Sequence, residues 1–255
     1  MRTDPLQALQ AASRTAPKAA PKPTVLIAGA AGVLGNEVVR RLVGTQRLGA
    51  THVLVREPLQ SALRGVNALE VKAGDMEHWP RLHADTGLIM FDPPRLYYGR
   101  ERALLTPQPS ELLPVARWMR ACGVQTLAVV LPHAQGRLPD AVKRGLANLD
   151  EQAVAALGFE RLLLVRSAQK PVEAKAGKLL ERTAAWMLSV AKFMVPPSEQ
   201  PVRATKVAEL VDWALQTAPP GIHVAPPELV WRASQGNVRD VVAQWLQGPA
   251  LAAQR

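Results

Sequence analysis

The 255-residue sequence has one cysteine, Cys122, and only two tyrosines and three phenylalanines. A single cysteine cannot form an internal disulfide, which fits a reducing compartment. Because Cys122 precedes an apolar run, we expect it to pack in the core rather than act as a nucleophile. Charged residues, proline or glycine interrupt every apolar run within a dozen residues, so none resembles a membrane span. We therefore expect a cytoplasmic protein with no membrane span.

Acidic residues are also scarce relative to basic ones. The formal net charge is +10, and the isoelectric point is near 10.3. Such an excess favours contact with anionic groups. The basic residues are dispersed, however, and no aromatic residues alternate with them as base stacking would require. We interpret the charge as a solvated basic face that also attracts an anionic cofactor, and we predict no nucleic-acid partner.

No motif for a metal site is present, and no repeat period is visible. The five histidines lack a cysteine or carboxylate at helical ligand spacing, so we predict no bound metal. They are His52, His78, His83, His133 and His223.

The chain divides into three parts by composition. Residues 1–23 are rich in alanine, proline and basic residues, lack the apolar centre of a secretory signal, and predict a flexible leader. Their Arg, Ala and Ser content leaves a transit peptide open, although Asp4 and the Pro–Lys pairs argue against it. From residue 24 to residue 172, short β-branched runs alternate with helical stretches, which predicts a parallel sheet covered on both faces. These runs are TVLIAG, THVLV, ALEVKAG, GLIMF, TLAVVL and RLLLVR.

Residues 173–255 follow a different order. Two helices are predicted by the helical spacing of apolar residues in AKAGKLLERTAAWMLSVAKFM and in KVAELVDWALQ. A short strand is predicted at IHV, between proline turns, and a last helix follows through VRDVVAQWL. We expect a small, mainly helical cap interleaved with residues 24–172 as one globular unit. Trp186, Met187 and Met194 fit packing within this cap better than a membrane anchor.

The stretch TVLIAGAAGVLGNEVVRRL carries the most specific pattern. An apolar strand runs directly into Gly29, Gly32 and Gly35, and a helix follows. Gly29 permits a sharp turn, Gly32 lets backbone approach a pyrophosphate, and Gly35 lets the helix pack close to the strand. The helix N-terminus offers N–H groups to phosphate. The pattern predicts a Rossmann-type dinucleotide site that includes the glycines and residues Ala31, Val33 and Leu34.

The end of the second strand indicates which dinucleotide is preferred. An acidic residue there binds the ribose 2′-hydroxyl of NAD, whereas an arginine accommodates the 2′-phosphate of NADP. In THVLVREP the strand ends at Val55 and Arg56 follows. A guanidinium matches phosphate geometry, so we favour NADP over NAD. Glu57 leaves the alternative open, because its carboxylate could reach the ribose instead.

Three segments together resemble a known family. VLIAGAAGVLGNEVVRRLVG, HVLVREP and LEVKAGDMEHWPRL, at their mutual spacing, look like the atypical short-chain dehydrogenase/reductase superfamily, in particular its NmrA-like NAD(P)-binding branch. The resemblance is specific over residues 24–91 and looser to residue 166. It implies that Asp75 and Met76 lie beside the adenine.

The acid/base residues of that superfamily are missing here. Its reductases pair a tyrosine with a lysine four residues later, usually with an upstream serine, and the lysine lowers the pKa of the phenol. The two tyrosines, Tyr97 and Tyr98, are followed four residues later by Glu101 and Arg102. The helix in which the pair is expected has Lys143 and no tyrosine. The catalytic residues therefore remain unknown.

Weak substitutes follow the expected strands. Ligands of open α/β sheets bind beyond the carboxyl ends of the strands, which is where we expect Asp92, Tyr97, Tyr98, His133 and Ser167. A histidine could donate a proton near neutral pH. A loop histidine bonded to backbone, a turn aspartate and tyrosines that anchor a loop explain the same residues without chemistry.

Two functional hypotheses stay open at this point. In the first, the protein is an NADP-dependent oxidoreductase that acts on a small carbonyl or quinone-like compound through unconventional residues. In the second, it is a non-catalytic dinucleotide sensor or scaffold that binds a protein partner through its cap. The missing tyrosine and lysine favour the second hypothesis. The glycine turn is compatible with both.

Overall fold

The computed structural model describes residues 22–59, 65–95, 99–133, 149–168 and 202–252. Seven parallel strands form one sheet in the order β3-β2-β1-β4-β5-β6-β7. The strands are β1 (Thr24–Ala28), β2 (Ala50–Val55), β3 (Asn67–Glu70), β4 (Thr86–Met90), β5 (Thr126–His133), β6 (Arg161–Ala168) and β7 (Gly221–Ala225). The strand order runs outward on both sides of β1 and β4, which confirms the predicted α/β doubly wound, Rossmann-type sheet.

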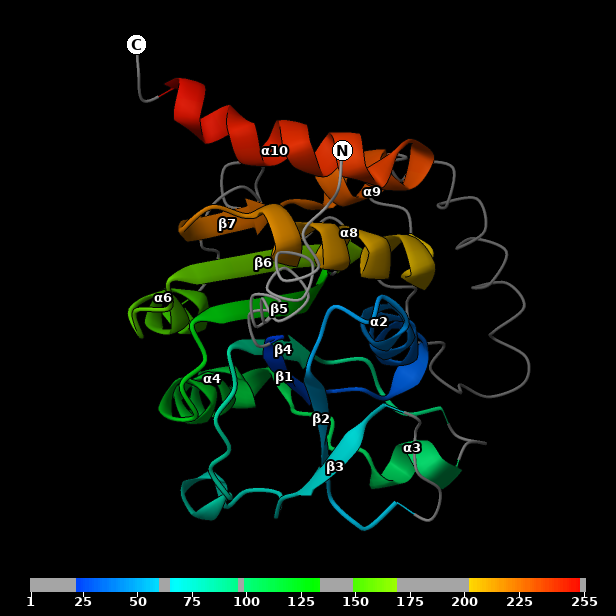
Figure 1. Ribbon diagram of the computed structural model, residues 1–255, viewed down its shortest axis with the longest axis vertical. Helices are drawn as coiled ribbons and strands as arrows, with labels where there is room; N and C mark the ends of the chain where they lie inside the picture. Colours follow the sequence, from blue (N-terminus) through cyan, green and yellow to red (C-terminus); the bar gives the residue numbers. More distant parts are fainter. Residues whose placement is uncertain (1–21, 60–64, 96–98, 134–148, 169–201, 253–255) are drawn as a thin grey trace, which may run out of the picture.

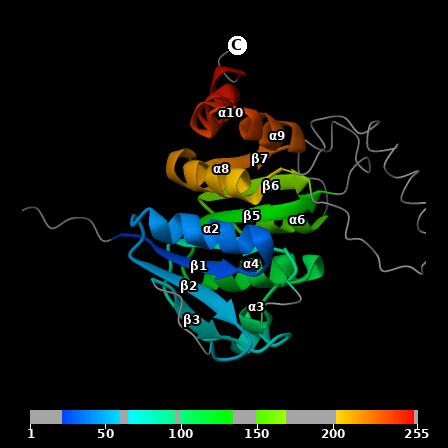
Figure 2. The ribbon, with the colours of Figure 1, turned by 90° about the vertical axis from the view of Figure 1, so that its right-hand side faces the viewer.

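Helices cover both faces of this sheet (Figures 1 and 2). Helices α2 and α8 lie on one face, and α4 and α6 lie on the other, whereas α9 and α10 lie near the β7 edge. The helices are α2 (Gly32–Gly44), α3 (Gly99–Ala103), α4 (Leu112–Ala121), α6 (Leu149–Ala155), α8 (Ala204–Thr217), α9 (Pro227–Gln235) and α10 (Val238–Ala252), with short 3₁₀ turns η1 (Met76–His78) and η2 (Pro109–Glu111).

The apolar strands are explained by burial on both faces. In β1, Val25 and Ile27 belong to the hydrophobic core beneath α2 and α8, whereas Leu26 and Ala28 belong to the core beneath α4. Successive residues of a strand point to opposite faces, so a strand that is covered on both sides needs apolar residues at every position. This is why these runs are continuous rather than alternating. Cys122 lies in the second core, as expected, and burial raises the pKa of its thiol.

The C-terminal part completes the sheet. The predicted short strand is β7, which pairs with β6 from Arg161 to Val165, and the predicted helices over KVAELVDWALQ and VRDVVAQWL are α8 and α10. Helix α9 was missed, because the proline turn before it was interpreted as a loop. The predicted helix with Trp186, Met187 and Met194 lies outside the described residues, as does the leader up to residue 21.

The described residues contain neither a membrane-spanning helix nor a group of metal ligands. None of their helices combines the length and the apolar composition that crossing a bilayer requires. Within the same ranges, no three histidine, cysteine or acidic side chains are grouped so that they could hold a metal ion.

Candidate functional site

The glycine turn joins β1 to α2 as predicted. Gly29 and Gly32 have φ angles of 84° and 72°, in the left-handed region that side chains with a Cβ disfavour. A Cβ on Gly29 would lie 1.8 Å from the carbonyl oxygen of Met90, and a Cβ on Gly35 would lie 2.5 Å from the carbonyl oxygen of Gly29. The first and third glycines are therefore required by close packing of the turn against β4 and of α2 against the turn.

The N-terminus of α2 takes its hydrogen-bond acceptors from a distant segment. The residue before the helix is Ala31, which has no side-chain acceptor, and the first turn contains no acidic residue. The backbone N–H of Gly32 donates to Oε2 of Glu101 at 3.1 Å, and the N–H of Leu34 donates to Oδ2 of Asp92 at 2.9 Å. The first turn of a helix leaves N–H groups unsatisfied, and here two carboxylates from the connection between β4 and α4 satisfy two of them.

Glu101 is held by several donors at once. Its side chain is 1% exposed, and its carboxylate accepts hydrogen bonds from Gly32, from Asn36 Nδ2 at 2.9 Å, and from the backbone and the guanidinium of Arg95. Burial alone would raise the pKa of Glu101. The hydrogen bonds from Arg95 and Gly32 and the positive charge of Arg95 outweigh burial and lower the pKa below its ordinary value. Glu101 is therefore ionised at neutral pH.

The residues after Glu101 cross the carboxyl ends of β1 and β2. The N–H of Gly29 donates to the carbonyl of Leu105, and the N–H of Leu105 donates to the carbonyl of Leu54, both at 2.9 Å. Leu104 forms an antiparallel bridge with Val55. Figure 2 shows α3 beyond the arrowhead of β2. The chain thus lies across the edge of the sheet where dinucleotides bind in this fold.

Arg56 contacts the same crossing segment. Its backbone N–H donates to the carbonyl of Ala103 at 2.7 Å, and its guanidinium donates to the carbonyl of Thr106 at 3.3 Å. Arg56 and Glu57 are both exposed. Arg56 therefore bonds to the segment that crosses the strand ends, through its backbone and its guanidinium, and its role in a cofactor site stays a prediction.

Asp75 and Met76 lie in the turn after β3. Oδ1 of Asp75 and Nδ1 of His78 are 2.5 Å apart, and the Asp75 side chain is half-exposed. The hydrogen bond and charge of Asp75 raise the pKa of His78. Met76 packs against the core beneath α4. Their assignment to an adenine site stays a prediction.

The carboxyl ends of β5 and β6 form the other half of this edge. Pro132 pairs with Ser167 and His133 with Ala168 in the β5–β6 register, and Ser167 is buried. Beside them, the guanidinium of Arg166 and the carboxylate of Glu151 form an ion pair of 2.7 Å in which both side chains are 3% exposed. Charges this deeply buried require such a partner.

The weak catalytic candidates have different outcomes. The carboxylate of Asp92 is bound to the N-terminus of α2, which gives it a structural role. Tyr97, Tyr98 and Lys143 lie outside the described residues, and so does the side chain of His133.

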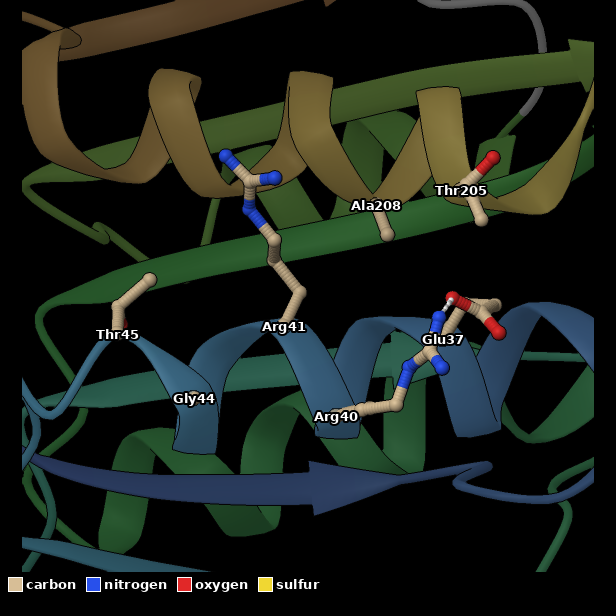
Figure 3. A pocket seen from close by; sticks show the side chains of 7 residues that line it. All are labelled: Glu37, Arg40, Arg41, Gly44, Thr45, Thr205 and Ala208. Carbon is tan, nitrogen blue, oxygen red and sulfur yellow. Dashed lines mark hydrogen bonds and ion pairs between the residues drawn. The ribbon is translucent and has the colours of Figure 1, made fainter.

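A groove of about 370 Å³ lies elsewhere, between α2 and α8. Figure 3 shows Arg41 reaching from α2 toward α8, and Arg40 turned toward Glu37. Arg41 pairs with Asp212 at 2.9 Å, and Arg40 pairs with Glu37 at 2.6 Å. Since both arginines are paired within the chain, the groove has no evident anion-binding role.

Sequence reasoning missed Glu101 and Arg95 as parts of the site. Glu101 bonds to Gly32 across 69 positions, and no local spacing encodes a contact of that range. One feature of the sequence could have indicated that Asp92 binds the N-terminus of α2. Helix α2 begins without a capping side chain, and Asp92 follows the neighbouring strand, whose carboxyl end meets the same edge of the sheet.

Comparison with known proteins finds similarity of fold. No protein-family model and no curated protein matches the chain. The enzyme WbmG of Bordetella bronchiseptica, solved in complex with NAD, is 12% identical over 86% of this chain and 80% of its own, with a TM-score of 0.45. A nucleoside-diphosphate-sugar epimerase of Staphylococcus aureus is 11% identical over 88% and 95%, with a TM-score of 0.46. The NmrA-like branch and the preference for NADP stay predictions.

Proposed function

We propose that this chain binds a nicotinamide dinucleotide, NADP(H) in preference to NAD(H), and acts as a sensor or scaffold rather than as a conventional short-chain reductase. One observation carries the proposal: the N-terminus of α2 presents the N–H groups of Gly32 and Leu34 to anionic oxygens. Here the oxygens belong to carboxylates. A pyrophosphate offers the same acceptor chemistry to the same helix end.

The preference for NADP(H) rests on Arg56. Its guanidinium lies at the end of β2, beside the turn, and makes one bond of 3.3 Å to a backbone carbonyl. A guanidinium carries five N–H donors in a fixed fork, so a 2′-phosphate would be a stronger, charge-assisted acceptor than that carbonyl.

A sensor or scaffold role rests on the missing chemistry. The sequence has no tyrosine followed four residues later by lysine, and Pro132 and His133 stand where the serine is expected. Asp92 is bonded to Leu34. An output through residues 173–255, which would contact a protein partner in one redox state of the cofactor, accounts for a cofactor site without the tyrosine–lysine pair.

Titration of cofactor-stripped protein with NADPH and NADH tests the proposal, with tryptophan fluorescence and calorimetry as readouts. We expect tighter binding of NADPH. Arg56→Ala should weaken NADPH by about 1.5–3 kcal/mol, because it removes a charge-assisted contact, and should leave NADH nearly unchanged. Arg40→Ala is the matched control, since Arg40 is 74% exposed on the outer side of α2.

Two results would contradict the proposal. An unchanged preference in Arg56→Ala would remove this residue from the site. Oxidation of NADPH by small carbonyl or quinone compounds would show a reductase and contradict the sensor role.

A further inference from the structure

We propose that residues 92–95 and 99–106, called here the occluding segment, are an internal competitor of the dinucleotide, with the Glu101 carboxylate bound where a phosphate would bind. This inference rests on the proposed function and concerns the regulation of the same site. A dinucleotide would enter only after the occluding segment has left the glycine turn.

The space above the turn is filled to contact distance. A Cβ built on Gly32 would lie 2.4 Å from Oδ2 of Asp92 and 2.8 Å from the carbonyl oxygen of Pro93. Gly32 is the residue whose missing side chain lets a pyrophosphate approach the backbone in this fold. In this structure Asp92 and Pro93 occupy the position from which a pyrophosphate would approach Gly32. A phosphate and these two residues cannot occupy the same position.

The charges are also mutually exclusive. Glu101 and Asp92 each place a carboxylate on an N–H group of the first turn of α2. A phosphate brought to the same N–H groups would lie at hydrogen-bond distance from these carboxylates. Repulsion between the like charges disfavours the presence of phosphate and carboxylates at this position together. Within the segment, Arg95 balances Glu101, so the charge pair can leave together.

The segment also contacts Arg56, the residue proposed to select NADP(H). The carbonyls of Ala103 and Thr106 accept hydrogen bonds from the backbone and the guanidinium of Arg56, while Leu105 bonds to Gly29 of the glycine turn and to Leu54 of β2. Opening the segment would free the helix N-terminus and Arg56 in one movement. Closure therefore reduces the apparent affinity for dinucleotide to the intrinsic affinity multiplied by the fraction of open molecules.

The test compares the full-length wild type with Glu101→Gln, using NADPH and inorganic pyrophosphate as two separate ligands. The amide keeps the shape of Glu101 but loses its charge and part of its bonding to Arg95 and Gly32. We expect both ligands to bind at least tenfold more tightly to the variant. Glu111→Gln removes the same charge from a half-buried position of the same connection, where Glu111 Oε2 accepts from the N–H of Gln108 and not from α2, and should change neither affinity.

The outcomes separate this inference from the proposed function. Tighter binding of pyrophosphate, with no binding of NADPH by either protein, would support the occluding segment and contradict dinucleotide binding. NADPH binding that is the same in wild type and variant would overturn the occluding segment and leave the proposed function intact. Failure of both proteins to bind either ligand would overturn both.

A second variant covers the case in which Glu101→Gln does not fold. Asp92→Asn weakens the bond to Leu34 without touching the Glu101–Arg95 pair. It should shift both affinities in the same direction by a smaller factor, about threefold. Unchanged affinities in a folded Asp92→Asn protein would likewise overturn the inference.

Discussion

The carboxyl ends of the strands form two halves of one sheet edge, one at β1 and β2 and the other at β5 and β6, and the two halves hold different groups. At β1 and β2 the glycine turn leads into the N-terminus of α2, and the carboxylates of Glu101 and Asp92 are bound there. At β5 and β6 the expected serine is replaced by Pro132 and His133, and the nearby charges of Glu151 and Arg166 neutralise each other. Among the described residues, the first half is thus defined by backbone geometry and the second by a buried ion pair.

The largest loss of stability should follow from a substitution at Gly29, in the half of the edge at β1 and β2. In Gly29→Ala the new Cβ would collide with the carbonyl of Met90 at 1.8 Å, and the backbone has a positive φ of 84°. Because backbone must move, we expect the free energy of unfolding to fall by about 4 kcal/mol or more. Urea denaturation followed by circular dichroism measures it.

Gly44→Ala provides the matched control for this substitution. No atom lies within 4 Å of a Cβ at Gly44, which is in the last position of the same helix. Alanine should be neutral or stabilise the protein by up to about 1 kcal/mol. A Gly29→Ala protein as stable as Gly44→Ala would show that the turn is not packed as described.

A somewhat smaller loss of stability should follow from a substitution at Glu151, in the half of the edge at β5 and β6. Glu151→Ala removes the carboxylate from a pair in which both side chains are 3% exposed, and takes this charge partner from the buried guanidinium of Arg166. We expect a loss of about 3 kcal/mol in the free energy of unfolding.

Glu37→Ala is the control on the surface. Its pair with Arg40 is 2.6 Å long but 74% exposed on the arginine side, so the loss should be about 0.5 kcal/mol or less. Equal losses for Glu151→Ala and Glu37→Ala would contradict the structural role given to the buried pair.

Sequence patterns predicted the sheet better than the contents of the site. Five of the six β-branched runs are strands because burial on both faces demands continuous apolar residues, and this demand is local, whereas the run that forms β3 (Asn67–Glu70) is mostly exposed. Gly29 and Gly35 follow the same logic, since each glycine relieves a contact within its own turn or with the adjacent strand.

The contacts of the occluding segment could not be predicted from sequence. Glu101 meets Gly32 across 69 positions, and Leu105 meets Leu54 and Gly29 through backbone groups that every residue carries. Periodicity does not encode such contacts. The missing cap on α2 was the available sign that a distant acceptor was needed.

Hydrogen exchange of individual amides, with and without NADPH, tests the central claim most directly. The claim is that the N–H groups of Gly32 and Leu34 pass from internal carboxylates to a dinucleotide. The account predicts that these two amides stay protected in both states, while residues 99–106 exchange faster once NADPH is bound. If NADPH binds and residues 99–106 remain as protected as in the free protein, the dinucleotide does not occupy the glycine turn and the account is contradicted.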